Sequence, residues 1–292
     1  MPGTGSFNYV PSDYTCMTRG TLGVIACPML EDELIYSLGK DPESKRVYVL
    51  DTPYNGSLRR KMGQKGVEYE TANEWDFMNG ALDLDRDGFN VVIRMKNLAL
   101  HAEPKELMQN LENDLVMLQG RVDAVAMYYG MCGNYGMDLT KWAEENLDFP
   151  VATFRDGKGR VCDDCVGVAV GGPEGYQRLI KEYTGVMLFT PAVATNWEDF
   201  LGASDMAKGL DVLGPSNKKE QMKWMLEMCG YSSVVQIDTG LEDRAEFDAA
   251  TKDFADCMGL KILQADQGYA DKGPADRIYA ESKGYLGSKE TD

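Results

Sequence analysis

The stretch TLGVIACPMLEDELIYSLGK, residues 21–40, decides the fold. Its opening, TLGVIAC, is a short apolar run typical of a buried strand. The following EDELIYSLGK has apolar residues at helical spacing and a glycine stop at Gly39. Cys27 therefore lies where a strand passes into a helix.

The same alternation of strand and helix recurs along the chain. Further strands are predicted at 45–52, 89–96, 123–130, 150–154, 186–193, 232–239 and 260–266. Further helices are predicted at 104–120, 139–147, 173–185, 197–203, 218–230 and 242–258. Residues 55–88 form a polar and then acidic stretch, for which we predict no regular element and a turn at DRDG (85–88).

Strands that alternate with helices require crossover connections. The sequence therefore predicts an α/β fold with a mainly parallel sheet, helices on both faces and Rossmann-like units. We expect a flexible segment over 1–20, one α/β domain over 21–266 and a polar tail over 267–292. Two subdomains with a boundary near 150–165 are the alternative. Functional groups in such folds gather at the carboxyl ends of the strands.

The composition excludes several classes of protein. The 292-residue chain has a net charge of −17, which opposes nucleic-acid binding. It has no apolar stretch of the roughly 18–20 residues that a membrane helix needs, and its first residues do not resemble a signal peptide. We expect a cytoplasmic protein that does not contact a membrane. Its composition is compatible with a homo-oligomer.

Seven cysteines, an odd number, do not indicate a disulfide scaffold. Cys27 and Cys132 each follow a predicted strand, where a helix N-terminus can lower the pKa of a thiol. Cys162 and Cys165 form a CxxC pair in VCDDC, which suits half a zinc site better than redox exchange because two aspartates oppose thiolate formation. The competing interpretation is that each cysteine is a small buried hydrophobe.

Two more features join this set. Cys132 lies in MYYGMCGNYGM (127–137), where Tyr129, Gly130 and Gly133 flank the thiol and are expected to contact a bound cofactor. The only histidine, His101, lies between a predicted strand and a predicted helix, which makes it a candidate donor.

Other motifs are absent or incomplete. The sequence has neither a P-loop nor a G-x-G-x-x-G after a strand. The stretch DLDRDG (83–88) begins like a calcium loop, but Arg94 stands where a bidentate glutamate is required.

Four ordered segments resemble a family that carries only the label of a domain of unknown function. They are IACPMLEDEL, ALHAEPKEL, YYGMCGNYG and DDCVGVAVGGPEGYQRLIKEYTGVMLFTPAVATNW, within residues 20–266. The resemblance implies that Cys27, Glu33, His101, Cys132 and Cys165 are the characteristic residues, whereas Cys162 lies outside the pattern. It also implies a setting in methanogens and other anaerobes, with genes near those of corrinoid methyltransferases.

The preferred hypothesis is a cysteine-ligated metal centre in anaerobic one-carbon metabolism. Cys27, Cys132 and Cys165 would be the sulfur ligands of an iron–sulfur cluster or a zinc ion, with His101 or Cys162 as the fourth donor. Glu33 would transfer protons or orient a ligand.

Two alternatives stay open, and with them the question whether the chain is an enzyme. One is a partner protein of corrinoid methyltransferase components without catalysis of its own. The other is a metal-free thiol enzyme that uses Cys132 as its nucleophile.

Overall fold

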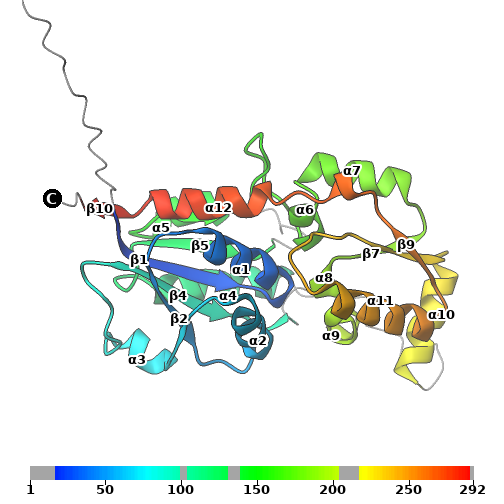
Figure 1. The fold of residues 1–292 in the computed structure, drawn as a ribbon, viewed down its shortest axis with the longest axis horizontal. Helices are drawn as coiled ribbons and strands as arrows, with labels where there is room; N and C mark the ends of the chain where they lie inside the picture. Colours follow the sequence, from blue (N-terminus) through cyan, green and yellow to red (C-terminus); the bar gives the residue numbers. More distant parts are fainter. Residues whose placement is uncertain (1–16, 99–103, 131–138, 204–216, 290–292) are drawn as a thin grey trace, which may run out of the picture.

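The computed structural model describes residues 17–98, 104–130, 139–203 and 217–289 of the chain. These residues form two parallel sheets that lie side by side, each covered by helices (Figure 1). The predicted α/β class, with a mainly parallel sheet and helices on both faces, is confirmed.

The first sheet has the strand order β3-β2-β4-β1-β5-β6, and all pairs along this path are parallel. A short strand, β10, pairs antiparallel with the start of β1. The strands span Met17–Ala26 (β1), Arg46–Leu50 (β2), Glu70–Ala72 (β3), Phe89–Met95 (β4), Ala124–Tyr128 (β5), Val151–Thr153 (β6) and Gly287–Lys289 (β10).

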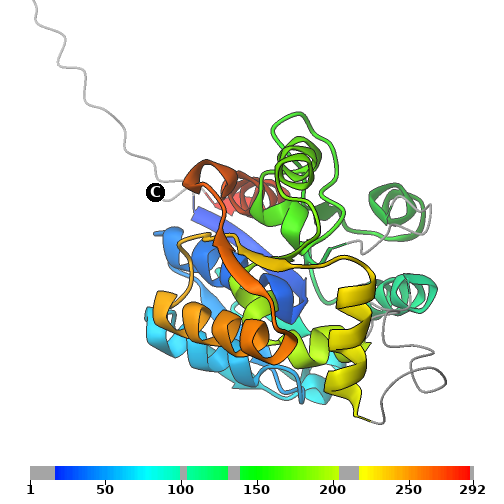
Figure 2. The same ribbon diagram turned by 90° about the vertical axis from the view of Figure 1, so that its right-hand side faces the viewer.

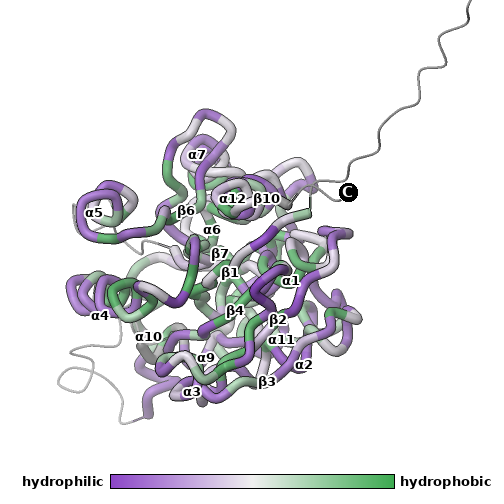
Figure 3. Tube along the Cα trace, turned by 90° about the vertical axis from the view of Figure 1, so that its left-hand side faces the viewer, coloured by the Kyte–Doolittle hydropathy of each residue, from purple (hydrophilic) through white to green (hydrophobic). Residues whose placement is uncertain are grey.

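Helices cover both faces of this sheet. One apolar cluster joins side chains of β1, such as Leu22 and Val24, to α1, α2 and α12. The other joins Ile25 of β1 to α4 and α5 on the opposite face, as the alternation of side chains along a strand requires. The helices span Pro28–Leu30 (η1), Glu31–Lys40 (α1), Gly56–Lys65 (α2), Glu74–Met78 (α3), Pro104–Met117 (α4), Leu139–Asn146 (α5) and Gly273–Gly284 (α12). Figure 3 shows apolar residues along the central strands and hydrophilic ones on the surrounding helices.

The crossovers from β1 and β5 leave the sheet in opposite directions. From β1 the chain passes through α1 to β2, and from β5 it passes through α5 to β6 on the other side. Because β1 and β5 are neighbours, their carboxyl ends lie at a topological switch point, where α/β proteins form a crevice.

The second sheet is smaller and has the parallel order β7-β8-β9. Helix α7 lies on one side of it, and α10 and α11 lie on the other (Figures 1 and 2). Phe254 of α11 packs against Phe189 at the end of β7, with ring centroids 4.5 Å apart. The elements span Cys165–Ala169 (α6), Pro173–Glu182 (α7), Val186–Phe189 (β7), Pro191–Thr195 (α8), Trp197–Ala203 (α9), Lys218–Met228 (α10), Ser233–Gln236 (β8), Arg244–Met258 (α11), Lys261–Gln264 (β9) and Gln267–Tyr269 (η5).

After β9 the chain returns to the first sheet through α12. The expectation of a polar tail over 267–292 is wrong for this segment, because α12 is a packed helix. Ala275, Ile278 and Tyr279 form a buried stripe against the first sheet, and the Tyr279 hydroxyl donates to Asp41 Oδ2 at 2.8 Å. Three apolar positions at helical spacing suffice to bury a helix whose remaining residues are polar.

Three other segments depart from the sequence predictions. The polar stretch 55–88 contains α2, β3 and α3. The strand predicted at 186–193 ends at Phe189, because Thr190 caps α8 and Pro191 begins it. β1 begins at Met17, so the last four residues of the segment 1–20, predicted to be flexible, belong to a strand. Within the described residues, no helix is both long and apolar enough to cross a bilayer.

We expect Ile278→Ala to lower the free energy of unfolding by about 2–4 kcal/mol, because it leaves a cavity under α12. Ile278 is fully buried, whereas Ile262 of β9 is 40% exposed. Ile262→Ala is therefore the matched control and should cost less than about 1 kcal/mol. Urea unfolding measures both; equal losses would show that α12 is not anchored to the first sheet.

Candidate functional site

A cleft of about 470 Å³ opens at the carboxyl ends of β1 and β5. We call it the cysteine cleft, because Cys27, Gly130 and Cys165 line it. Its remaining walls come from η1, α6, α7, β7 and the loop before β8, so it lies between the two sheets. The other described lining residues are Met29, Leu30, Leu98, Asp164, Val166, Tyr176, Ile180, Val186, Met187, Leu188 and Tyr231.

Cys27 caps the N-terminus of η1 and is buried, with 4% of its surface exposed. Its backbone N–H donates to the Tyr128 carbonyl at 2.9 Å, which extends the β1–β5 pairing by one residue. Burial raises the pKa of the Cys27 thiol to about 12, although hydrogen bonds from the Met29 backbone N–H and the Tyr129 side chain act in the opposite direction. The Met29 N–H and the Tyr129 hydroxyl thus lie near the sulfur, but no positive charge of a described residue outweighs the cost of desolvation.

Cys165 is the first residue of α6 and is half-buried. Asp164 caps this helix, and its side chain accepts a hydrogen bond from the Gly167 N–H at 2.6 Å. Cys165 packs against three apolar clusters, the two that cover the first sheet and a third between α6 and α7. It therefore lies where the two halves of the chain meet.

Gly130 permits the close approach of β5 to α6. A Cβ atom at this position would lie 3.1 Å from the Cα of Asp164 and 3.3 Å from the backbone nitrogen of Cys165. Because both neighbours are backbone atoms, they cannot move aside as a flexible side chain could. The absence of a side chain at Gly130 brings Cys165 to the end of β5.

The structure separates the candidate ligands into three groups. Cys27 and Cys165 share the cysteine cleft with Gly130, and Tyr129 contacts the Cys27 sulfur. Cys162 does not line the cleft. His101, Cys132 and Gly133 lie outside the described residues.

Cys162 is buried in the apolar cluster between the first sheet and α12, together with Phe154 and Val168. Burial raises its thiol pKa to about 12, and the negative charge of Asp156 acts in the same direction. Its surroundings are those of a core residue. The CxxC pair does not bring both of its thiols into the cleft, because Cys162 is buried in the core before α6, whereas Cys165 is the first residue of that helix.

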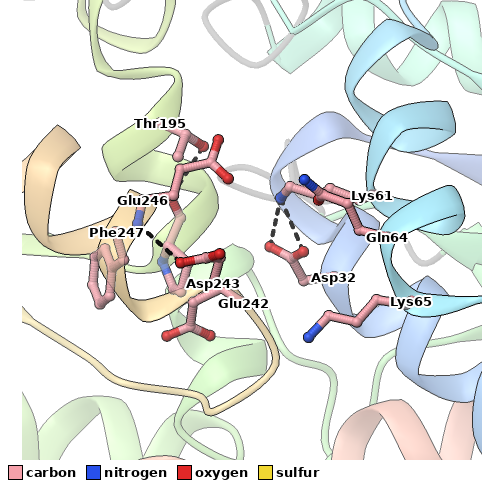
Figure 4. A pocket seen from close by; sticks show the side chains of 10 residues that line it. Asp32, Lys61, Gln64, Lys65, Thr195, Glu242, Asp243, Glu246 and Phe247 are labelled. Carbon is pink, nitrogen blue, oxygen red and sulfur yellow. Dashed lines mark hydrogen bonds and ion pairs between the residues drawn. The ribbon is translucent and has the colours of Figure 1, made fainter.

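A second cleft, of about 300 Å³, lies between α1 and α2 on one side and α8 and α11 on the other. Figure 4 shows its polar side chains, among them Asp32, Lys61 and Glu242. Lys61 Nζ lies 2.8 Å from an Asp32 oxygen and 2.9 Å from Glu31 Oε1, and all three side chains are buried. The sequence analysis missed this group, because acidic residues in a first helical turn are common and Lys61 lies in an unpredicted helix.

Glu33 lines neither cleft in the described part of the chain. It is buried, and its pKa is raised to about 8 by desolvation, then by the charges of Asp32 and Glu242. Its electrostatic neighbours thus belong to the second cleft, six residues beyond Cys27 along the sequence. A proton-transfer role for Glu33 stays a prediction.

No metal-binding group of three or more His, Cys, Asp or Glu side chains occurs among the described residues. The cysteine cleft contains two described thiols, those of Cys27 and Cys165, which is fewer than such a group requires. Neither is in a disulfide. Soft thiolate sulfurs suit zinc and iron–sulfur clusters.

Residues 95–271, more than half of the chain, match the sequence model of a family described as "Protein of unknown function (DUF1638)". Three of the four segments quoted above lie inside this range, and IACPMLEDEL precedes it. No curated protein matches the sequence.

We expect Gly130→Ala to lower the free energy of unfolding by about 1–3 kcal/mol, because its Cβ would push the start of α6 away from β5. Gly56→Ala is the control, since a Cβ there meets no atom within 4 Å. It should be neutral or stabilising in urea unfolding. A tolerated Gly130→Ala would mean that the contact with α6 is loose.

Glu33→Gln should change the pH dependence of stability. The pKa of Glu33 is about 8 in the folded chain, above its ordinary value of 4.5, so the folded state binds more protons between these values. The wild type should therefore lose stability as the pH rises from about 5 to 8, by up to about 1.4 kcal/mol per pH unit, and the variant should not show this loss. Urea unfolding at pH 5 and pH 8.5 tests this, with the exposed Glu68→Gln as control; parallel curves for wild type and Glu33→Gln would contradict it.

Proposed function

We propose that this chain, which belongs to the DUF1638 family of proteins of unknown function, is a metalloprotein whose metal binds in the cysteine cleft. Cys27 and Cys165 are two of the proposed ligands. The observation that carries the proposal is that these two thiols, distant in sequence, line one cleft at the switch point of the sheet.

The surroundings of Cys27 support a bound cation. The Met29 N–H and the Tyr129 hydroxyl lie near a sulfur whose pKa is nevertheless raised to about 12. Donors of this kind stabilise a thiolate, and the positive charge of a metal would supply what desolvation removes. Without a cation the thiol stays protonated at neutral pH, so Cys27 is a poor nucleophile by itself.

The remaining ligands are proposed from chain connectivity. Cys132 is two residues beyond Gly130, so their Cα atoms are at most about 7.6 Å apart. His101 is three residues beyond Leu98, also in the lining, which keeps its Cα within about 11.4 Å of that residue. We propose Cys132 as the third ligand and His101 as the fourth, rather than the core residue Cys162. This set suits an iron–sulfur cluster or a tetrahedral zinc ion.

The proposed setting rests on the family resemblance alone. It is the cytoplasm of an anaerobe, with a role in one-carbon metabolism beside corrinoid methyltransferase components. A pull-down from native lysate tests this partnership, and recovery of no methyltransferase component would contradict it.

Metal analysis after anaerobic purification tests the centre itself. We expect either about four irons per chain with a brown colour, or about one zinc without colour. Cys27→Ser and Cys165→Ser should each lower the metal content at least several-fold, because each removes a ligand. Cys132→Ser should do the same.

Two matched variants make this test specific. Cys229→Ser should retain the metal, since Cys229 is exposed at the end of α10. Cys162→Ser should retain it too, but with lower stability. Wild-type protein that carries neither metal would overturn the proposal, and selective alkylation of Cys132 in that protein would favour a metal-free thiol enzyme.

A further inference from the structure

We propose that the cysteine cleft binds a small organic cation with apolar substituents, held by Asp164 and by the rings of Tyr176 and Tyr231. This inference deepens the proposed function and rests on it for the position of the metal. Nothing in it depends on which metal is bound.

The described lining of the cleft disfavours anions. It contains no Lys, Arg or His, and its one charged side chain is the carboxylate of Asp164. The charged group that acts most strongly on Asp164 is the neighbouring carboxylate of Asp163. A phosphate or carboxylate ligand would find no cationic side chain among these described residues, whereas an organic cation would lie beside a desolvated carboxylate.

Two aromatic rings complete the polar side of the cleft. Tyr176 comes from α7, and Tyr231 from the loop before β8. Asp164, Cys165 and Tyr231 all act electrostatically on the Tyr176 hydroxyl, so these groups lie near one another. The negative face of an aromatic ring attracts cations, and tyrosines beside a carboxylate are a common way to hold a quaternary ammonium group.

The aliphatic side chains of the cleft favour a cation that carries alkyl groups. Leu30, Leu98, Ile180, Val186 and Leu188 offer aliphatic surface. A volume of about 470 Å³ lies in the range of small-molecule sites. A hydrated inorganic cation would gain nothing from such walls, whereas alkyl groups would be removed from water.

A pair of isosteric probes tests the charge preference. Choline and 3,3-dimethylbutan-1-ol have nearly the same shape, but only choline is charged. We expect choline to bind the purified full-length chain at least tenfold more tightly in isothermal titration calorimetry. Equal affinities, or no binding of either probe, would overturn the inference.

Substitutions assign the charge preference to this cleft. Asp164→Asn keeps the helix cap, because asparagine caps as well as aspartate, but removes the charge. It should weaken choline binding about tenfold and leave the neutral probe unchanged. Asp256→Asn is the matched control, since Asp256 is exposed on α11 and outside the lining, and it should change neither affinity. If Asp164→Asn leaves choline binding intact, the inference is wrong.

Failure of this inference and failure of the proposed function give different results. Metal content is measured in every sample, and both titrations are repeated after removal of the metal. A chain without metal that still prefers choline supports the inference and overturns the metal proposal. A metal-loaded chain that binds both probes equally supports the metal proposal and overturns the inference of a cation site.

Discussion

The pairing of β1 with β5 is the constraint on which the site depends. It ends with the hydrogen bond from the N–H of Cys27, the residue after β1, to the carbonyl of Tyr128, the last residue of β5. That bond places the Cys27 sulfur beside the Tyr129 side chain. Since the two crossovers diverge from this point, the space above it stays open for a ligand.

Residues from the second half of the chain form the other walls of that space. The start of α6 lies against Gly130, at backbone contact distance, and carries Cys165 with it. The chain then builds the second sheet and returns through α12 to pack on the first (Figure 1). Because both connections join the two sheets, the cysteine cleft has walls from each, and its geometry depends on both.

The two clefts differ in the charged side chains of their described linings. In the described lining of the cysteine cleft, Asp164 is the one charged side chain, and no Lys or Arg is present. In the second cleft, the ammonium of Lys61 forms ion pairs with two carboxylates, Glu31 and Asp32, within a buried group. Such a group stabilises little in net terms, because desolvation offsets most of the Coulomb attraction, but loss of one partner leaves a buried charge unpaired. The described lining of the second cleft thus combines acidic side chains with lysines, whereas that of the cysteine cleft has one carboxylate and no cationic side chain.

Local pattern by itself determined the α/β class, most of the strands and the position of Cys27 at a strand end, because period-two and period-3.6 spacing are properties of neighbouring residues. Only the tertiary structure decided which cysteines meet. Cys162 and Cys165 are three residues apart, yet Cys162 is in the core below α12 and Cys165 lines the cleft. Cys27, far away along the chain, lines the same cleft as Cys165. The burial of α12 and of Lys61 likewise depends on surfaces supplied by distant segments. Convergence of this kind is set by strand order and by close backbone contacts such as the one at Gly130, which no spacing along the sequence encodes.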